Sequence, residues 1–246
     1  MQDQILAVDI GATNIKFCHV DEHGEMLESV RRRPTPYPCL PERLIEALVE
    51  RIEADDCPRV GIGFPGEFRD GRVVRPGNLS RPGGVTTEVD PELEAQWVGF
   101  DLEPAMCEAT GRDVRIVNDA TLAALGSVVG HGIELVLTLG TGLGIALAFD
   151  GQLQKIRDVG AEVFVRSKTY DQSIGEHSRS LDEAHWLELL VLAVDGFVRE
   201  FHAETVHLAG GNARRVTPML FADKAYHVVI NGNQASIKGA AKLFHS

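Results

Sequence analysis

A pattern of strand, glycine turn, strand and acidic turn occurs twice in this chain of 246 residues, at a constant offset of 129 residues. The offset brings three pairs of equivalent residues into register: Asp9 with Thr138, Gly11 with Gly140, and Asp21 with Asp150. Repetition of one supersecondary unit predicts two structurally related halves. We therefore expect two α/β domains, residues 1–118 and 119–246, each presenting a glycine-rich hairpin, with a phosphate-containing ligand between the hairpins.

The hydrophobic pattern predicts the other elements. Short apolar runs bounded by turns indicate strands, and apolar residues spaced three and four apart indicate amphipathic helices. The expected strands are residues 5–10, 15–20, 25–32, 60–64, 114–117, 206–209 and 227–230. The expected helices are residues 41–54, 120–129, 181–201 and 237–243.

Two of these helices carry capping signals at their start. Asn118 or Asp119 suits the N-cap of the helix over 120–129, because a short polar side chain can accept hydrogen bonds from first-turn amides. Ser180 and Glu183 have the spacing of a capping box for the helix over 181–201. Within that helix we expect His185 and Trp186 to be packing residues.

Charge, cysteine usage and hydropathy exclude several classes of protein. The 24 Lys and Arg against 36 Asp and Glu give a net charge of -12, which opposes phosphate attraction, so we expect no nucleic-acid partner. The four cysteines lie far apart and predict neither a disulfide framework nor a zinc site. The longest apolar stretch, residues 135–149, is too short for a membrane span and contains glycines, and no signal peptide is apparent. We expect a cytoplasmic protein without a membrane partner.

The densest basic run is Arg31 to Arg33. Such a run is usually the solvated end of a strand. It could also guide a polyanionic substrate, and the same role is open to a more scattered basic set in the second half: Lys155, Arg157, Arg166 and Lys168.

Both glycine turns have a composition that suits phosphate binding. Small residues let backbone amides approach phosphate oxygens, and Thr13, Asn14 and Thr141 add polar donors. Asp9 precedes the first turn and could hold Mg²⁺ through water, because that ion prefers one or two carboxylates together with phosphate oxygens. Lys16 could reach a phosphate or face the solvent.

Two motifs near the middle of the chain have alternative interpretations. Gly61 to Gly66 matches the dinucleotide fingerprint, but a turn at Asp70 and Gly71 replaces the helix that should bind pyrophosphate, so we reject an NAD site. Asp119 follows a strand and could accept a proton from an alcohol during phosphoryl transfer, or serve only as a helix cap.

Together these residues resemble the ROK family of sugar kinases, and within it the polyphosphate glucokinase and glucomannokinase branch. The matching stretches are residues 9–16, 34–36, 61–66, 77–79 with Trp97, 117–120, 138–144, 150–151, 210–211 and 239–241. The resemblance implies the actin-like ATPase fold, with two ribonuclease-H-like domains of mixed five-stranded sheets flanked by helices and an interdomain cleft. The last helix could pack back on the first domain. No cysteine follows Cys107, which matches the branch without the zinc cluster of other members.

The resemblance also implies the site residues. It places Asp119 at the position of the catalytic base. The positions that match sugar-binding residues are Pro65, Gly66, Asn78, Asn118, Asp119 and Asp158. Those that match the phosphoryl-donor site are Asp9, Gly11, Ala12, Thr13, Asn14, Lys16, Thr138, Gly140, Thr141, Gly142 and Gly144, with Gly210 and Gly211 beside the nucleotide when ATP is used.

Two departures from the family pattern fall within these motifs. Ala12 replaces a family glycine and fits only where its φ is negative. The stretch from Asp158 to Ala161 replaces a family Glu-x-Gly-His whose Glu and His contact the sugar. Asp158 is shorter and Ala161 has no hydrogen-bonding side chain, so each lost hydrogen bond should cost about 0.5–1.5 kcal/mol unless Glu162 or another side chain fills the gap.

The sequence therefore predicts a cytosolic sugar kinase that transfers a phosphoryl group from polyphosphate or ATP, with Mg²⁺ and without zinc, to the 6-hydroxyl of glucose or mannose. The alternative is a degenerate family member that binds sugar or phosphate without appreciable turnover. We do not expect a repressor, because repressor members carry an N-terminal DNA-binding module and the first predicted strand begins at Ile5. A homodimer is the commonest assembly for such proteins.

Overall fold

The computed structural model describes residues 4–245 and forms two compact units. Unit 1 runs to Leu122 and includes the C-terminal segment from Ser236 onward, and unit 2 is Ala123–Ala235. The C-terminal segment therefore belongs to the unit that contains the N-terminal strands.

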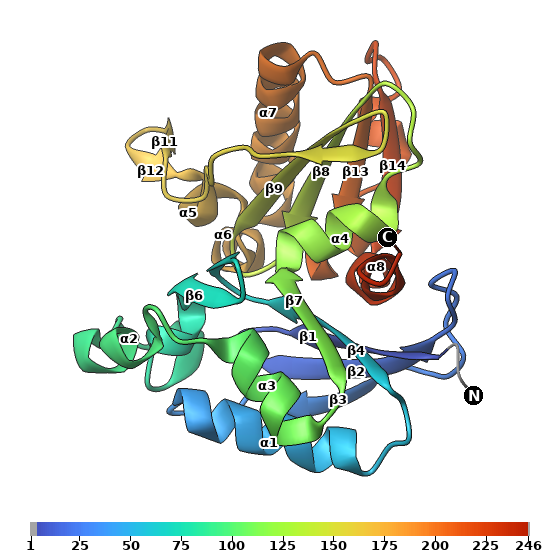
Figure 1. The fold of residues 1–246 in the computed structure, drawn as a ribbon. Coiled ribbons are helices and arrows are strands. Elements are labelled where there is room, and N and C mark those ends of the chain that lie inside the picture. Colours follow the sequence, from blue (N-terminus) through green and yellow to red (C-terminus); the bar gives the residue numbers. More distant parts are fainter. Residues whose placement is uncertain (1–3, 246) are drawn as a thin grey trace. The chain divides into compact units, whose positions relative to one another are not determined.

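Unit 1 is built on a mixed five-stranded sheet (Figure 1). Its strands, in spatial order, are β3 (Arg31–Pro34), β2 (Asn14–Val20), β1 (Ile5–Ile10), β4 (Arg59–Phe64) and β7 (Asp113–Asn118). β1 pairs antiparallel with β2 and parallel with β4, and β4 pairs parallel with β7. The carboxyl ends of β1, β4 and β7 therefore meet at one edge of the sheet.

Unit 2 repeats this arrangement. Its strands, in spatial order, are β10 (Gln152–Gln154), β9 (Leu143–Phe149), β8 (Ile133–Leu139), β13 (Thr205–Ala209) and β14 (His227–Gly232). β8 pairs antiparallel with β9 and parallel with β13. An offset of 129 residues carries the bounds of β2 onto those of β9, so the duplication predicted from the sequence is confirmed.

Helices cover both faces of the sheet in unit 1. On one face, α1 (Pro41–Glu53), α2 (Pro91–Trp97) and α3 (Leu102–Thr110) share a core with the strands. On the other face, α8 (Ala235–Lys242) and the first turn of α4 (Asp119–Ser127) pack in a smaller core. The helix predicted at 41–54 begins at its proline, because the first-turn amide that proline lacks has no partner within a helix.

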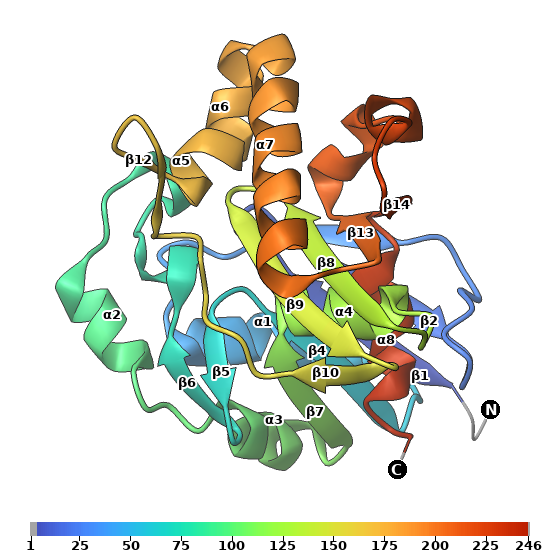
Figure 2. The ribbon, with the colours of Figure 1, turned by 90° about the horizontal axis from the view of Figure 1, so that it is seen from above.

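In unit 2, α7 (Glu183–Phe201) lies along one face of the sheet (Figure 2), with Trp186, Leu190 and Val194 fully buried. Mostly alanine side chains fill the opposite face, together with the rest of α4. The remaining elements of unit 2 are β11 (Val163–Val165), β12 (Lys168–Thr169), α5 (Tyr170–Ile174), α6 (Glu176–Leu181), η3 (Gly211–Arg215) and η4 (Pro218–Phe221).

The third strand of the first sheet begins later than the sequence predicted. Residues 25–32 were expected to be a strand, but β3 is Arg31–Pro34, and Met26 forms only an isolated bridge to Val20. The side chain of Asp21 accepts hydrogen bonds from the amides of His23 and Glu25, at 2.9 and 2.8 Å. The chain still contacts β2 at Met26 and Leu27, but this contact and β3 differ in register by two residues, so the strand is interrupted between them.

The capping box predicted at Ser180 is also wrong. Ser180 lies within α6, where its hydroxyl donates to the carbonyl of His177, and α7 is capped by Asp182, which accepts from the amide of His185. A true capping box occurs instead at Thr169, at the start of α5. His185 is exposed rather than packed, whereas Trp186 is buried as predicted and donates its indole N–H to Ile174.

Cys18, Cys39 and Cys57 are buried, Cys107 is half-buried, and all four are unpaired thiols. Within residues 4–245, every helix is too short or too polar to cross a bilayer.

A buried carboxylate stabilises the start of the sheet in unit 2. Glu134 is fully buried and accepts hydrogen bonds from the amides of Val129 and Gly130, at 2.9 and 2.7 Å. Its Oε2 also lies 2.7 Å from Nε2 of the equally buried His207. Burial raises the pKa of Glu134, but these amides and His207 outweigh it, so the pKa lies below its usual value.

Replacing Glu134 should therefore destabilise the protein strongly. We expect Glu134→Ala to lower the free energy of unfolding by about 3–5 kcal/mol, because it leaves buried amides and an imidazole without their acceptor. Urea denaturation measures this loss. The control Glu188→Ala removes an exposed carboxylate on α7 and should cost less than about 0.5 kcal/mol. A loss below about 1 kcal/mol for Glu134→Ala would contradict the assignment.

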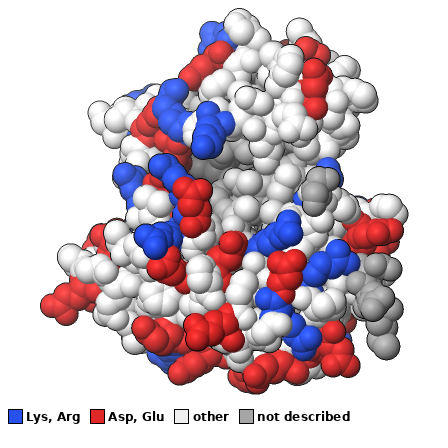
Figure 3. Space-filling model, viewed as in Figure 1, with Lys and Arg blue, Asp and Glu red and all other residues white. Residues whose placement is uncertain are grey.

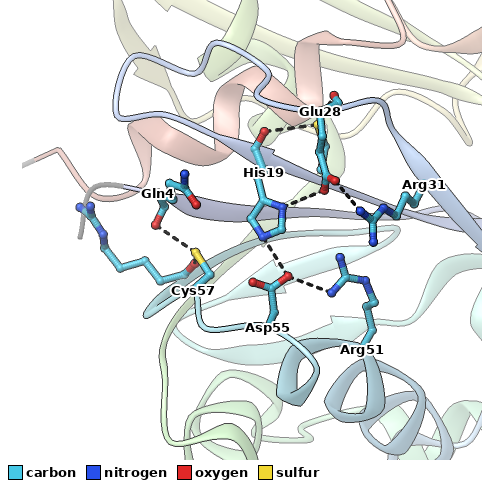
Figure 4. A network of polar contacts seen from close by, with 9 residues as sticks. Gln4, His19, Glu28, Arg31, Arg51, Asp55 and Cys57 are labelled. Carbon is cyan, nitrogen blue, oxygen red and sulfur yellow. Dashed lines mark hydrogen bonds and ion pairs between the residues drawn. The ribbon is translucent and has the colours of Figure 1, made fainter. Parts of the chain in front are cut away.

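In unit 1, a histidine joins three separate segments (Figure 4). His19 of β2 has its Nδ1 2.7 Å from Glu28 Oε1 and its Nε2 2.8 Å from Asp55 Oδ2. The His19 ring thus bridges the carboxylates of Glu28 and Asp55. Asp55 also accepts from Arg51 of α1, at 2.9 Å. Burial raises the pKa of Asp55, but hydrogen bonds from Arg51 and His19 outweigh it and hold the pKa below its ordinary value.

This lowered pKa predicts how Asp55 contributes to acid stability. A carboxyl with a lowered folded-state pKa stabilises the fold fully above its unfolded pKa of about 4 and loses that contribution as the pH falls through the folded pKa. We expect Asp55→Asn to be about 1–3 kcal/mol less stable than wild type at pH 7, with the gap closing below about pH 4. Denaturation across this pH range, with exposed Asp56→Asn as control, measures the gap. A gap independent of pH would refute the expectation.

Candidate functional site

Candidate residues of unit 1 gather where β1, β4 and β7 end. Asp9 lies near the end of β1, Pro65 and Gly66 follow β4, and Asn118 ends β7 directly before Asp119. Parallel strands place these positions at one sheet edge because their carboxyl ends coincide. The parallel pairing of the three strands thus assembles residues that are up to 110 positions apart in the sequence.

Gly63 separates the two aspartates of this edge. A Cβ built on Gly63 would lie 3.6 Å from Asp9 Oδ1 and 3.5 Å from the Cα of Asp119. Asp9 Oδ2 accepts hydrogen bonds from Lys16 Nζ and from Ser236 Oγ, both at 2.8 Å. The Lys16 ammonium group therefore does not extend into the solvent, because it forms an ion pair with Asp9, which precedes the glycine turn.

The first glycine turn is held from behind by the segment after β3. Its carbonyl oxygens accept three hydrogen bonds: Gly11 from Thr35 Oγ1 at 2.6 Å, Ala12 from Tyr37 Oη at 2.7 Å, and Thr13 from the Thr35 amide at 3.0 Å. Within residues 4–245, the backbone amides of Ala12 and Thr13 donate no hydrogen bond. These two amides are therefore available to a ligand, as an anion site requires.

Ala12 meets the condition set by the sequence. The described non-glycine residues with positive φ are Asp70, Asp150, Arg166, Ser167 and His202. Ala12 is not among them, so its side chain causes no backbone strain where the family has glycine.

Asn118 and Asn78 lie on either side of Gly66. The Asn118 side chain donates to the carbonyl of Gly66 at 2.7 Å, and its Oδ1 accepts from the amides of Ala120 and Thr121, which caps α4. A Cβ on Gly66 would overlap the Arg75 carbonyl and lie 3.1 Å from the amide nitrogen of Gly77. The backbones of Gly66 and of Gly77, which has φ of +56°, are therefore in close contact. Asn78 is the next residue, at the start of η1 (Gly77–Ser80).

In unit 2, the second glycine turn is fixed by side chains from later segments. The carbonyl of Gly140 accepts from Asn212 Nδ2 at 3.2 Å and from the Glu176 amide at 2.9 Å. Gly210 has φ of +85° and packs on the backbone of Leu139, where a Cβ would be 2.6 Å from the carbonyl oxygen. The structure therefore brings the Gly140 turn and the Gly210–Gly211 turn side by side.

Asp171 is a residue of this region that the sequence analysis missed. Its Oδ1 accepts from the Leu143 amide at 2.8 Å, and its own amide donates to the carbonyl of Gly160 at 2.9 Å. Burial, followed by the nearby carboxylate of Asp158, raises its pKa, and the Leu143 amide opposes the rise. Asp171 thereby connects the second glycine turn to the turn that contains Asp158. A single acidic residue in a first helical turn gives no signal of such a contact.

The Asp158 turn is closed by its own side chain. Asp158 Oδ1 accepts from the amide of Gly160 at 2.9 Å. Glu162, which was considered as a replacement for the missing family histidine, lies 2.6 Å from Arg157 Nε. This ion pair directs the Glu162 carboxylate to Arg157, which also contacts Glu200 at 3.1 Å.

Asp9 fits a water-bridged cation better than a direct one. No group of three or more His, Cys, Asp or Glu in the described part of the chain could hold a metal by itself. Asp9 is 8% exposed, and its Oδ1 accepts none of the hydrogen bonds found among residues 4–245. One carboxylate oxygen beside a phosphate-binding turn is the protein contribution that Mg²⁺ usually takes, with water and phosphate completing its shell.

Known sugar kinases are similar to this chain in sequence. A glucokinase of Thermotoga maritima is 29% identical over 170 residues, which cover 65% of this chain and 49% of that protein. A polyphosphate glucokinase of Mycobacterium tuberculosis is 27% identical over 154 residues, covering 59% and 53%. The chain thus spans about half the length of these curated relatives.

Solved structures extend the likeness to the whole chain. The crystal structure of an inorganic polyphosphate/ATP-glucomannokinase from Arthrobacter sp. strain KM aligns over 98% of both chains, with a TM-score of 0.79 and 28% identity. The expected fold class, the actin-like ATPase fold with mixed five-stranded sheets, is thereby confirmed. The model of the ROK family matches residues 5–160, more than half of the sequence. This chain belongs to the ROK family.

Proposed function

We propose that this chain is a sugar kinase that phosphorylates the 6-hydroxyl of a hexose, glucose or mannose, with Asp119 as the general base. The observation that carries the proposal is the position of Asp119 beside Asp9, across Gly63, at the carboxyl edge of three parallel strands. A base that lies next to a phosphate-binding turn can serve a hydroxyl that attacks the phosphate.

The proposed reaction divides between the two ends of the site. The amides of Ala12 and Thr13 bind oxygens of the transferring phosphoryl group, as donors placed where charge develops. Asp119 accepts the proton of the sugar hydroxyl. The hydroxyl oxygen forms a bond to the transferred phosphorus, and the bond between that phosphorus and the bridging oxygen of the donor breaks. Asn118 keeps the loop of Gly66 in place, and Asn78 beside it is available to a sugar hydroxyl.

Mg²⁺ is the proposed metal, and Asp9 is the residue that would hold it through water. When bound, it would neutralise charge on the phosphate oxygens. Lys16 keeps Asp9 Oδ2 occupied at 2.8 Å, which leaves Oδ1 as the oxygen for the hydrated ion.

Inorganic polyphosphate and ATP are both proposed donors. Support comes from the relatives named above, of which one is a polyphosphate glucokinase and another a polyphosphate/ATP-glucomannokinase. For ATP, the proposed nucleotide contacts are the backbone of Gly210, which has a positive φ, and that of Gly211.

A second candidate is a sugar- or phosphate-binding protein without appreciable turnover. It is favoured by the Asp158 segment, where Asp158 closes its own turn, Ala161 offers no hydrogen bond and Glu162 is paired with Arg157. These features concern sugar affinity and leave the base and the phosphate turn unchanged, so we rank this candidate second.

The proposed function is tested by a matrix of hexoses against ATP and polyphosphate, with Mg²⁺, read as sugar phosphate formed. Turnover of at least one pair is expected. Thermal stabilisation by a sugar or by phosphate, with no product from any pair, would favour the second candidate instead.

Within this assay, Asp119→Asn should abolish most turnover. We expect kcat to fall by about 10²–10⁴, because the amide cannot accept the hydroxyl proton but still fits the start of α4. The matched control is Asp113→Asn at the start of β7, the strand that leads to Asp119, where the side chain is half-exposed and pairs with Arg115. Equal kcat in wild type and Asp119→Asn, with unchanged melting temperatures, would eliminate Asp119 as the base.

Ala161→His should improve sugar binding. A histidine restores a hydrogen-bonding side chain at the position of the family residue, worth about 0.5–1.5 kcal/mol, so KM for the hexose should fall roughly two- to tenfold with kcat little changed. Ala161→Phe controls for size alone. If Ala161→Phe lowers KM as much as Ala161→His, the hydrogen bond is not the cause.

A further inference from the structure

A charged pocket in unit 1 lies outside the site described above. It has a volume of about 680 Å³, and four arginines line it, Arg31, Arg32, Arg33 and Arg51, against two aspartates, Asp55 and Asp56. Its lining is therefore positive in a chain whose net charge is -12. On the face shown in Figure 3, by contrast, basic and acidic side chains are interspersed.

Arg51 forms the inner wall of this arginine pocket. Its side chain is 9% exposed, and its guanidinium lies 5.7 Å from the ring centroid of Phe17. Among residues 4–245 it donates one hydrogen bond, from Nη1 to Asp55 Oδ2 at 2.9 Å. A guanidinium has five N–H donors in a planar fork that suits carboxylates and phosphates. Most of the donors of a nearly buried cation thus remain unused beside a cavity.

Two carboxylates beside the pocket, Asp55 and Glu28, are already committed to other partners, and the third, Asp56, is exposed. Asp55 Oδ2 is shared between Arg51 and His19, and Glu28 is shared between His19 and Arg31. Figure 4 shows the guanidinium groups of Arg31 and Arg51 on the same side of the His19 ring. These carboxylates therefore orient the arginines and add little repulsion to an incoming anion.

The outer arginines are weakly held. Within residues 4–245, Arg33 forms one ion pair, with Glu50, whose side chain is 70% exposed, and such a surface pair contributes little. Arg32 is exposed and has no ion pair with any residue that the structure describes. Both side chains can turn to a ligand at low cost.

Strand β3 connects the pocket to the first glycine turn. Pro34 pairs with Asn14 of the turn, and Arg31 lies three residues further along the same strand. With a rise of about 3.3 Å per residue, Arg31 is roughly 10 Å from the turn. Thr35, which supports the turn, directly follows β3, so the three arginines of β3 lie at increasing distances from the turn.

We infer that the arginine pocket is a second phosphate-binding site, which holds the distal phosphates of an inorganic polyphosphate chain whose terminal phosphate lies at the Gly11–Asn14 turn. The inference rests on the proposed function for its donor. The basic set of the second half is a weaker candidate, because Arg157 there is consumed by Glu162 and Glu200. Guanidinium and phosphate form charge-assisted, bidentate hydrogen bonds, which gives the pocket its selectivity for this ligand.

The test compares long-chain polyphosphate with tripolyphosphate and ATP. In Arg31→Gln/Arg33→Gln, we expect the dissociation constant of long-chain polyphosphate to rise roughly tenfold or more, and its KM as donor to rise equally. Tripolyphosphate and ATP, held at the turn, extend only toward Arg33, which lies next to Pro34, so their dissociation constants should rise much less than that of the long chain. Both side chains are exposed, so the fold should survive, and the melting temperature verifies this.

The matched control is Arg69→Gln/Arg72→Gln, which removes two exposed arginines from the same unit outside the pocket. It should leave the affinity for long-chain polyphosphate within about twofold of wild type. An equal loss in control and test variants would overturn the inference, since net charge would then be the cause. An unchanged affinity in the test variant, no binding of long-chain polyphosphate by wild type, or an equal loss for tripolyphosphate would overturn it as well.

Calorimetric titration separates this inference from the proposed function. Binding of long-chain polyphosphate is measured without turnover, so the arginine pocket can be confirmed in a protein that forms no sugar phosphate. Conversely, turnover with ATP and an unchanged polyphosphate affinity in the test variant would retain the kinase and reject the pocket.

Discussion

The parallel pairing of β1, β4 and β7 is the constraint on which the candidate site depends. It places the ends of three strands at one edge, so that Asp9, Gly66 and Asn118 meet although the chain between them is long. One-residue slippage of β7 would turn its alternating side chains to the opposite face, which is disfavoured because Val114 and Ile116 are buried. The hydrophobic core of unit 1 thus fixes the register, and the register fixes where Asp119 begins its helix.

The sequence predicted what depends on local pattern and on repetition. The two hairpins, the helix at Pro41 and the burial of Trp186 follow from periodicity within a few residues. The constant offset of the repeat indicates that the two sheets are related. The resemblance to a family supplied the roles of scattered residues, which no spacing argument could have supplied.

The errors of prediction all involve contacts with distant or competing partners. The register with β2 shifts between Met26 and Arg31, which delays β3. Asp182, rather than the predicted Ser180, caps α7 because Ser180 lies within α6. Asp171 and the contacts of His19 join segments far apart in the chain, so they are invisible until the strands are paired. Capping motifs and acidic residues are common enough that their position alone does not identify such roles.

The close backbone contact between Gly66 and Gly77 has a consequence for how this part of the chain tolerates change. Between these glycines lies a hairpin, β5 (Glu67–Arg69) and β6 (Arg72–Arg75), whose tip is Asp70 and Gly71. Because the two ends of the hairpin are clamped to each other, its tip can lengthen without displacing Asn78. The tip is thus a natural location for inserting a reporter peptide or an affinity tag.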